Sequence, residues 1–203
     1  LGMEVFNERN GTTGYDRILW DNLLMYCLPY GKNVIGFSNT DAHWTDTVDS
    51  SFSVFMMEEN NVDNIKKTMQ NGAFFMVTRK IRPNEWIGPS EEIDVMNQGL
   101  PYPMFTNVAV DGHKISVNAV DSDRIQWIAN GKVIKEGPIN AENLTIDLDS
   151  IEGSENFQYV RAELYGEGGL TLTQAFIIDD GSEKLEANDE IKLFLADETI
   201  EKF

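Results

Sequence analysis

The sequence predicts an α/β segment followed by an all-β sandwich, in a chain of 203 residues. Strand and helix patterns alternate in the first half, whereas short strands separated by turn signals fill the second half. The charge changes with them: there are 8 basic and 11 acidic residues before Pro89, and 8 basic and 23 acidic after it. We therefore expect two domains, over residues 1–89 and 90–180, and an acidic tail over residues 181–203.

The first half opens with two strands joined by a helix. Met3 to Asn7 is a short strand. Apolar residues then recur three and four positions apart, which predicts an amphipathic helix that Pro29 and Gly31 end. These residues are Ile18, Leu19, Leu23, Tyr26 and Cys27. Asn33 to Phe37 is the next strand, and the order strand, helix, strand is typical of a parallel unit.

The same alternation continues after a polar loop from Ser38 to Ser51. A strand is predicted over Phe52 to Met57, a helix over Val62 to Gln70 and a strand over Ala73 to Val77, with Asn71-Gly72 as a left-handed helix cap. Parallel units carry their functional loops at the C-terminal ends of the strands. The loop after Phe37 is therefore where we look for a site.

The second half follows a proline-rich linker from Pro83 to Pro103, where we place the domain boundary. About seven short strands come next, a number and spacing typical of a small sandwich. They are Asn107–Val110, Lys114–Asn118, Arg124–Ala129, Lys132–Lys135, Leu144–Leu148, Gln158–Leu164 and Leu170–Ile178. Asp111-Gly112 and Asn130-Gly131 are predicted hairpin turns.

Composition excludes several functions. The net charge of −18 repels nucleic acid and anionic membranes, so neither is an expected partner. No apolar stretch is long enough to span a membrane, and the single cysteine, Cys27, is read as a core residue. The chain starts inside a strand pattern at Leu1, which predicts an N-terminally truncated protein. Cytoplasm is the default compartment, and export stays open because a signal would lie upstream.

Asp41 and His43 are the candidate metal ligands and catalytic residues. They follow the strand Asn33 to Phe37, and a carboxylate with an imidazole suits zinc, manganese or iron. The spacing alone favours a plainer interpretation, in which Asp41 caps the next turn and His43 is solvated. The other histidine, His113, follows a turn in the sandwich and is interpreted as a surface residue.

The surrounding sequence resembles the C-terminal third of the polymerase and histidinol phosphatase (PHP) family of metal-dependent phosphoesterases. The residues that carry the resemblance are Gly2-Met3-Glu4-Val5-Phe6-Asn7, Trp20-Asp21-Asn22-Leu23-Leu24, Val34 to His43, and Ile65 to Gly72 followed by Ala73-Phe74-Phe75. The sandwich, with Tyr159-Val160-Arg161-Ala162-Glu163, is similar to a small β-domain appended to some members.

The resemblance implies that residues 1–89 are the C-terminal strands and helices of a distorted seven-stranded βα barrel with two or three metals. It implies that Asp41 and His43 each ligate a metal, with partners from a segment that would precede Leu1. Glu4 and Asn7 lie at a strand end that points into the same mouth, and they are candidates for substrate binding or for ordinary hydrogen bonds to a loop. Arg79 is a candidate phosphate contact or a solvated partner of carboxylates in the sandwich.

The expected function is therefore phosphoesterase action on a small phosphorylated substrate by a water that divalent metals activate. Because two ligands do not make a metal cluster, the isolated chain is expected to be inactive and to bind metal weakly. The alternative is a non-catalytic module whose sandwich binds carbohydrate or a protein. A His-x-His strand upstream would favour the enzyme, and its absence the module.

The last expectation concerns association. The segments Val34 to Phe37 and Ala73 to Val77 are apolar enough to need cover on both faces. We expect the chain to self-associate, or to pair with an N-terminal barrel fragment. The other solution is cover by the sandwich and by the apolar run Ile191 to Leu195.

Overall fold

The N-terminal part of the fold is one parallel strand–helix–strand unit. A computed structural model describes residues 2–7, 13–81, 93–179 and 181–186. Strands β1 (Gly2–Asn7) and β2 (Ile35–Asn39) run parallel, and helix α1 (Thr13–Cys27) connects them. The helix passes into a 3-10 turn with Pro29 at its start, and Gly31 ends that turn with a positive φ of 73°. The first predicted strand, helix and strand are therefore present, although the second strand begins at Ile35 and not at Asn33.

The strands that follow do not continue the parallel order. Strands β3 (Ser51–Phe55) and β4 (Phe74–Thr78) are antiparallel, and helix α2 (Val62–Asn71) lies between them in the chain. The fold class of a βα-barrel segment followed by an all-β sandwich is therefore wrong. A continuous apolar run indicates that a strand is buried on both faces, but it carries no information about the direction of its neighbours.

Strand β4 instead joins the strands of the second half in one large sheet. The order is β10-β9-β12-β13-β4-β3, and β14 pairs with β12. The strands of the second half in this sheet are β9 (Arg124–Ala129), β10 (Lys132–Pro138), β12 (Tyr159–Gly166), β13 (Gly169–Leu172) and β14 (Phe176–Ile177). The predicted boundary at residue 89 therefore falls between strands that belong to the same sheet.

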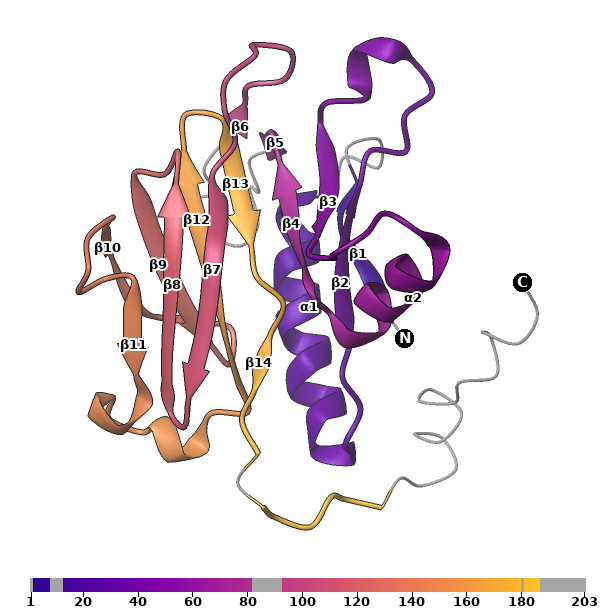
Figure 1. The fold of residues 1–203 in the computed structure, drawn as a ribbon. Coiled ribbons are helices and arrows are strands. Elements are labelled where there is room, and N and C mark those ends of the chain that lie inside the picture. Colours follow the sequence, from indigo (N-terminus) through magenta and orange to yellow (C-terminus); the bar gives the residue numbers. More distant parts are fainter. Residues whose placement is uncertain (1, 8–12, 82–92, 180, 187–203) are drawn as a thin grey trace.

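A smaller sheet covers one face of the large one (Figure 1). It has the order β11-β8-β7, with β7 (Met104–Asp111), β8 (Lys114–Val120) and β11 (Thr145–Asp147). Two sheets facing each other across apolar side chains are the arrangement of a β-sandwich. A further short pair is formed by β5 (Lys80–Ile81) and β6 (Ile93–Asp94).

Strand β12 lies between two cores, and its successive side chains point alternately into one and the other. Val160, Ala162 and Leu164 face the smaller sheet and pack with Trp127. Tyr159 faces the other way, into a core that contains Trp20 of α1. The second core also takes side chains from β1, β4 and β13, so α1 covers the face of the large sheet that the smaller sheet leaves open.

The apolar segments for which association was predicted have partners inside the chain. Strand β4 pairs with β3 on one edge and β13 on the other. Strand β2 pairs with β1 and lies beside β3, where the Ser38 backbone N–H donates to Ser53 Oγ at 3.1 Å. The apolar run Ile191 to Leu195 lies outside the described residues, and association between copies stays a prediction. Neither helix in the described ranges is long and apolar enough to cross a membrane.

Candidate functional site

The parallel unit brings the candidate residues to one edge. Strands β1 and β2 pair with an irregularity between Glu4 and Phe6, and Asn7 lies beside Asn39 at their C-terminal ends. The loop that carries Asp41 and His43 begins directly after Asn39. The candidates from β1 and from the loop after β2 therefore share the carboxyl end of the unit, as in other parallel sheets.

Glu4, Asn7 and Asn39 form a hydrogen-bonded group at this edge. The Asn7 amide nitrogen donates to Glu4 Oε2 at 2.9 Å, and the Asn39 amide nitrogen donates to Glu4 Oε1 at 2.7 Å. Asn7 is buried and Glu4 is exposed. Two amide donors fix the carboxylate of Glu4, which keeps the acceptor pointing in one direction at the strand ends.

Backbone geometry fixes the protonated nitrogen of His43. Asp41 has a φ of +49°, in the left-handed region, and the chain turns back there. His43 Nδ1 lies 2.7 Å from the backbone oxygen of Asp41. A carbonyl oxygen only accepts, so Nδ1 carries the hydrogen, and in the neutral ring Nε2 is the nitrogen with the lone pair. A backbone carbonyl is a common partner for the far nitrogen of a metal-binding histidine.

Contacts from the middle of the chain hold the loop in place. Arg79, at the end of β4, is buried, and its Nε lies 3.1 Å from Asp49 Oδ1. Its backbone N–H donates to the Ser50 oxygen at 2.7 Å. Asn97 donates through its side-chain amide to the backbone oxygen of Asp46 at 2.7 Å and through its backbone N–H to Asp49 at 3.3 Å.

These contacts give Arg79 a structural part. Its Nη1 donates to the Leu100 backbone oxygen at 2.7 Å, so the guanidinium joins the loop to the segment before β7. The predicted phosphate contact of Arg79 stays a prediction, and none of these bonds needs a substrate. The structure shows that the loop with Asp41 and His43 is held at its far end by the ion pair between Asp49 and the buried Arg79.

The donors at this edge suit a divalent cation, but they are few. A carboxylate and an imidazole with a defined Nε2 acceptor are ligands that zinc, manganese and iron take in proteins. Within the described ranges, no group of three or more histidine, cysteine, aspartate or glutamate side chains is placed to hold a metal. Asp41 and His43 would therefore supply two ligands, and any others would come from outside these ranges.

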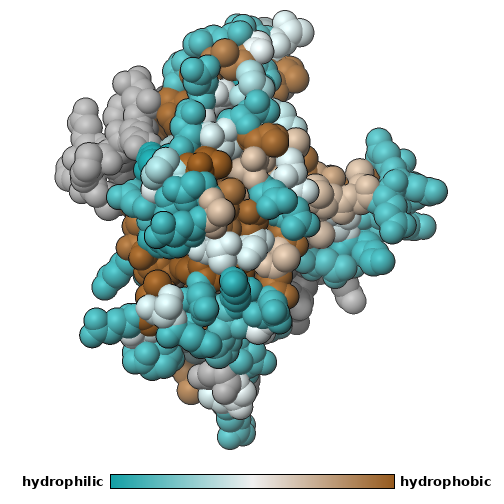
Figure 2. All heavy atoms as spheres, turned by 60° about the vertical axis from the view of Figure 1, so that its left-hand side comes forward, coloured by the Kyte–Doolittle hydropathy of each residue, from teal (hydrophilic) through white to brown (hydrophobic). Residues whose placement is uncertain are grey.

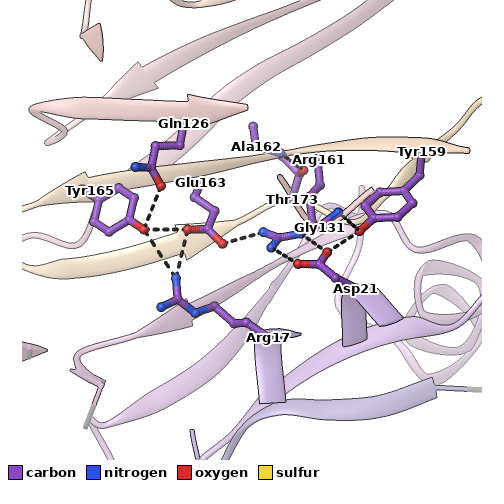
Figure 3. A network of polar contacts seen from close by, with 10 residues as sticks. All are labelled: Arg17, Asp21, Gln126, Gly131, Tyr159, Arg161, Ala162, Glu163, Tyr165 and Thr173. Atoms are coloured by element: carbon purple, nitrogen blue, oxygen red, sulfur yellow. Dashed lines mark hydrogen bonds and ion pairs between the residues drawn. The ribbon is translucent and has the colours of Figure 1, made fainter. Parts of the chain in front are cut away.

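A group of charged residues, most of them buried, lies elsewhere in the described part of the chain, between α1 and β12 (Figure 3). Arg161 pairs with both oxygens of Asp21, at 2.8 and 2.7 Å. Glu163 accepts from Arg161, from Arg17 at 3.0 Å and from Tyr165 at 2.6 Å. We call these residues the buried ion network.

The charges in the buried ion network support one another. Burial alone would raise the pKa of the Glu163 carboxyl, but Arg17 and Arg161 lower it to about 2. Burial raises the pKa of the Tyr159 hydroxyl, and the neighbouring Asp21 raises it further. All four carboxylate oxygens accept a hydrogen bond, so the network joins α1 to the large sheet.

Sequence reasoning missed the buried ion network, although signals for it exist. Arg17 and Asp21 are four positions apart on the predicted helix, and Arg161 and Glu163 are two apart on a predicted strand. Each pair therefore shares a face. Nothing in the pattern says that the two faces meet. His113, by contrast, is exposed at the β7–β8 turn as predicted, with Nδ1 2.7 Å from Asp149.

Comparisons with known proteins leave the family open. No family model, no curated protein and no solved structure matches the chain.

Proposed function

We propose that the protein is a metal-dependent phosphoesterase and that Asp41 and His43 are two of its metal ligands. The observation that carries the proposal is the bond from His43 Nδ1 to the Asp41 backbone oxygen, at the carboxyl end of a parallel unit. It presets the tautomer that leaves Nε2 as the donor atom for a cation. The resemblance to the PHP family supplies the reaction class.

Each residue has a part in this reading. Asp41 provides a hard carboxylate oxygen, and His43 provides Nε2. A bound divalent cation lowers the pKa of a coordinated water and stabilises negative charge on phosphoryl oxygens. Glu4 is held by Asn7 and Asn39 at the same edge, where its carboxylate orients a donor on the substrate or on a water. The loop behind His43 is fixed by Arg79 and Asn97, which keeps the two ligands at a constant separation.

The experiment measures metal binding at single residues. Manganese is added to the isotope-labelled chain, and paramagnetic broadening of backbone amides is recorded, because this readout detects weak sites. We expect selective broadening at Asp41 and His43, its loss in Asp41→Asn and His43→Gln, and no change in His113→Gln. Uniform broadening, or broadening that both loop variants retain, would contradict the proposal.

The second measurement is turnover. Phosphatase activity and metal content are measured on the protein expressed from its full reading frame, with the same three variants. We expect Asp41→Asn and His43→Gln to lose most of both, and His113→Gln to keep them. The chain of 203 residues alone is expected to be silent. Tight stoichiometric metal binding with turnover by the chain alone would contradict the expectation that Asp41 and His43 need further ligands from outside the chain.

A binding module is the second candidate, and one cleft favours it. A cavity of about 350 Å³ opens between β4, β7 and the β13–β14 connection, with a largely apolar wall that includes Phe74, Phe75, Val108 and Phe176. Pockets of this size and character bind small apolar groups. Val108→Asp places a charge in the wall. Retained phosphatase activity in this variant, together with loss of a bound apolar ligand, would separate the two functions.

A further inference from the structure

Strand β7 has an open outer edge. It is the last strand of the smaller sheet, and no strand in the described ranges pairs with its other side. Asp111 is the only charged residue among the eight of Met104–Asp111, and none of them is lysine or proline. The one irregularity of the strand lies near its start, between Phe105 and Asn107. Long uncharged edges are templates for another strand, and proteins usually protect them with charges, prolines or bulges. The stretch from Asn107 onward lacks this protection.

The backbone groups at this edge belong to Val108 and Val110. In an antiparallel ladder, successive residues direct their N–H and C=O groups to alternate sides. Val117 of β8 donates its N–H to the backbone oxygen of Leu144, just before β11, at 2.9 Å. Val108 lies opposite Val117, so neither bonds the other, and Val110 is two residues further along. The N–H and C=O groups of Val108 and Val110 therefore point away from β8, toward the open edge.

Strand β3 extends beyond the smaller sheet on the same side. The ring centroids of Phe105 in β7 and Phe75 in β4 are 5.0 Å apart, so β7 lies over β4. Strand β3 is next to β4 and ends the large sheet, whereas β8 and β11 lie on the other side of β7 (Figure 1). Val54 of β3 pairs with Phe75 and so shares its face. Val54 is half-buried, and Met56, two residues on, is 49% exposed. We call Val54, Met56 and the strand beneath them the β3 shelf.

A cavity connects the β3 shelf to the edge of β7. It is the cavity of about 350 Å³ described above, and its lining includes Met56, Asn107, Val108 and Phe176. Apolar side chains also reach the surface between polar ones on the face that Figure 2 shows. Paired strands lie about 4.8 Å apart and facing sheets about 10 Å apart, so a segment added to β7 would stand over β3. Its side chains at every second position would contact the shelf and enter the cavity.

The space over the β3 shelf fits one strand and excludes a second copy paired through β7. A second copy carries its own β4 beneath its β7, and that β4 would occupy the place of β3. The occupant is therefore a single extended segment. Charge favours a basic one, because the chain has a net charge of −18 and the exposed Glu58 and Glu59 follow the shelf.

We propose that the outer edge of β7 and the β3 shelf bind an extended basic segment of a partner protein by strand addition. The segment becomes the next strand of the smaller sheet and bonds the backbone of Val108 and Val110. It places an apolar side chain at every second position on the shelf. Main-chain bonds give such a complex its affinity, and the cavity gives it a side-chain preference. This inference does not depend on a metal at Asp41 and His43.

The test adds the synthetic peptide Lys-Val-Thr-Val-Lys-Val-Thr-Val-Lys to the isotope-labelled full chain and follows backbone amide shifts. We expect the largest shifts at Val108 and Val110, and contacts from the peptide's valine methyl groups to the Met56 methyl group. Two methylated peptides test the backbone pairing, one with N-methyl groups on its valines and the other with them on the residues between. Because only alternate peptide N–H groups face β7, we expect one of the two to bind at least about tenfold more weakly than the other.

Variants of the chain test the same contacts. Val110→Pro removes one outward N–H and leaves the bonds between β7 and β8, so we expect roughly tenfold weaker binding in a folded chain. Val110→Thr, the matched control, keeps the N–H and is expected to bind within about threefold of the wild type. Met56→Ser removes apolar area from the exposed part of the shelf and should weaken binding roughly fivefold. Unchanged amide shifts at Asn118 on β8 show that each variant is folded.

Several results would overturn the inference. Absence of peptide-induced shifts at Val108 and Val110 would do so directly. Equal binding of the two methylated peptides would show that no backbone pairing takes place. Shifts of equal size at Val133, on the opposite edge strand β10, would assign the interaction to general charge attraction. Shifts at Val108 and Val110 that depend on the concentration of the chain alone would assign the edge to a second copy.

Discussion

Asp41 and His43 show how much of a candidate site depends on backbone geometry. The residue types and their spacing were visible in the sequence, and they were enough to select the loop. The positive φ of Asp41 and the bond from His43 Nδ1 to its backbone oxygen were not. Aspartate tolerates the left-handed conformation, but its presence in a sequence does not predict that conformation, because aspartate also occurs in ordinary turns and caps.

The left-handed backbone at Asp41 predicts a stability order among variants. Asparagine and glycine adopt this conformation readily, whereas alanine is strained there. We expect Asp41→Ala to lower the free energy of unfolding by about 1 kcal/mol although the side chain is exposed, and Asp41→Asn and Asp41→Gly to stay within about 0.5 kcal/mol. Urea unfolding measures this. Asp46→Ala, on the same loop, is the control, and an equal loss there would show that the backbone of Asp41 is not the cause.

At the scale of the elements, the main feature is the buried ion network between α1 and β12. Helix α1 has an apolar stripe with Trp20 and Leu24. The same face places the half-buried Arg17 and the buried Asp21 against β12. Apolar packing alone leaves the helix free to slide or rotate by small amounts. Four charges with fixed partners, joined by the hydroxyls of Tyr159 and Tyr165, define one register.

Removal of one charge tests this register. Glu163→Gln removes the carboxylate that Arg17 and Arg161 share, so that Asp21 alone balances the buried Arg161. We expect a loss of about 3–5 kcal/mol, the value for a broken buried pair. Glu136→Gln, which removes an exposed partner of Arg124, should cost less than about 1 kcal/mol. Equal effects in urea unfolding would mean that the buried ion network is replaceable by neutral groups.

Glu163 also predicts an acid dependence. Its folded pKa of about 2 lies below the ordinary value of 4.5, so its contribution to stability is present above pH 4.5 and is lost as the pH falls toward 2. The contribution is on the order of 3 kcal/mol. Glu163→Gln lacks this titration, and the difference in unfolding free energy between wild type and variant should therefore shrink between pH 4.5 and 2. A difference that stays constant would contradict the assignment.

The sequence predicted which segments form helices and strands better than it predicted which strands pair with each other. The period of the apolar residues identified α1 and most strands of the second half. It did not identify the buried face of α1, because Ile18, Leu19 and Tyr26 of the predicted stripe are exposed, while Trp20 and Leu24 are buried. Strand β4 is buried on both faces, as predicted, but by α1 with β1 on one side and the smaller sheet on the other. Met76 and Phe75, adjacent in sequence, enter different cores, and no local pattern distinguishes this from burial in a parallel barrel.

At the scale of the whole molecule, the large sheet makes one body of two predicted halves. Leu170, Thr171 and Leu172 of β13 pair with residues of β4, and the core of α1 includes Tyr159 from β12. A chain with two independent domains would have few contacts across the boundary. Here the contacts across it include backbone ladders, an apolar core and the buried ion network.

The shared sheet predicts a single cooperative unfolding transition. Trp20 lies in the core next to α1, and Trp127 lies in the core of the sandwich, so the two side chains report on opposite faces of the large sheet. Opening the first core exposes the buried charges and unpairs β4 from β13, and the sandwich then loses the neighbour that covers its sheet. We expect the ¹⁹F resonances of 5-fluorotryptophan at these two positions to disappear with the same urea midpoint, and Glu163→Gln to lower both midpoints together. Midpoints that separate, with Trp20 lost first while Trp127 keeps its folded signal, would show that the sandwich holds its structure alone.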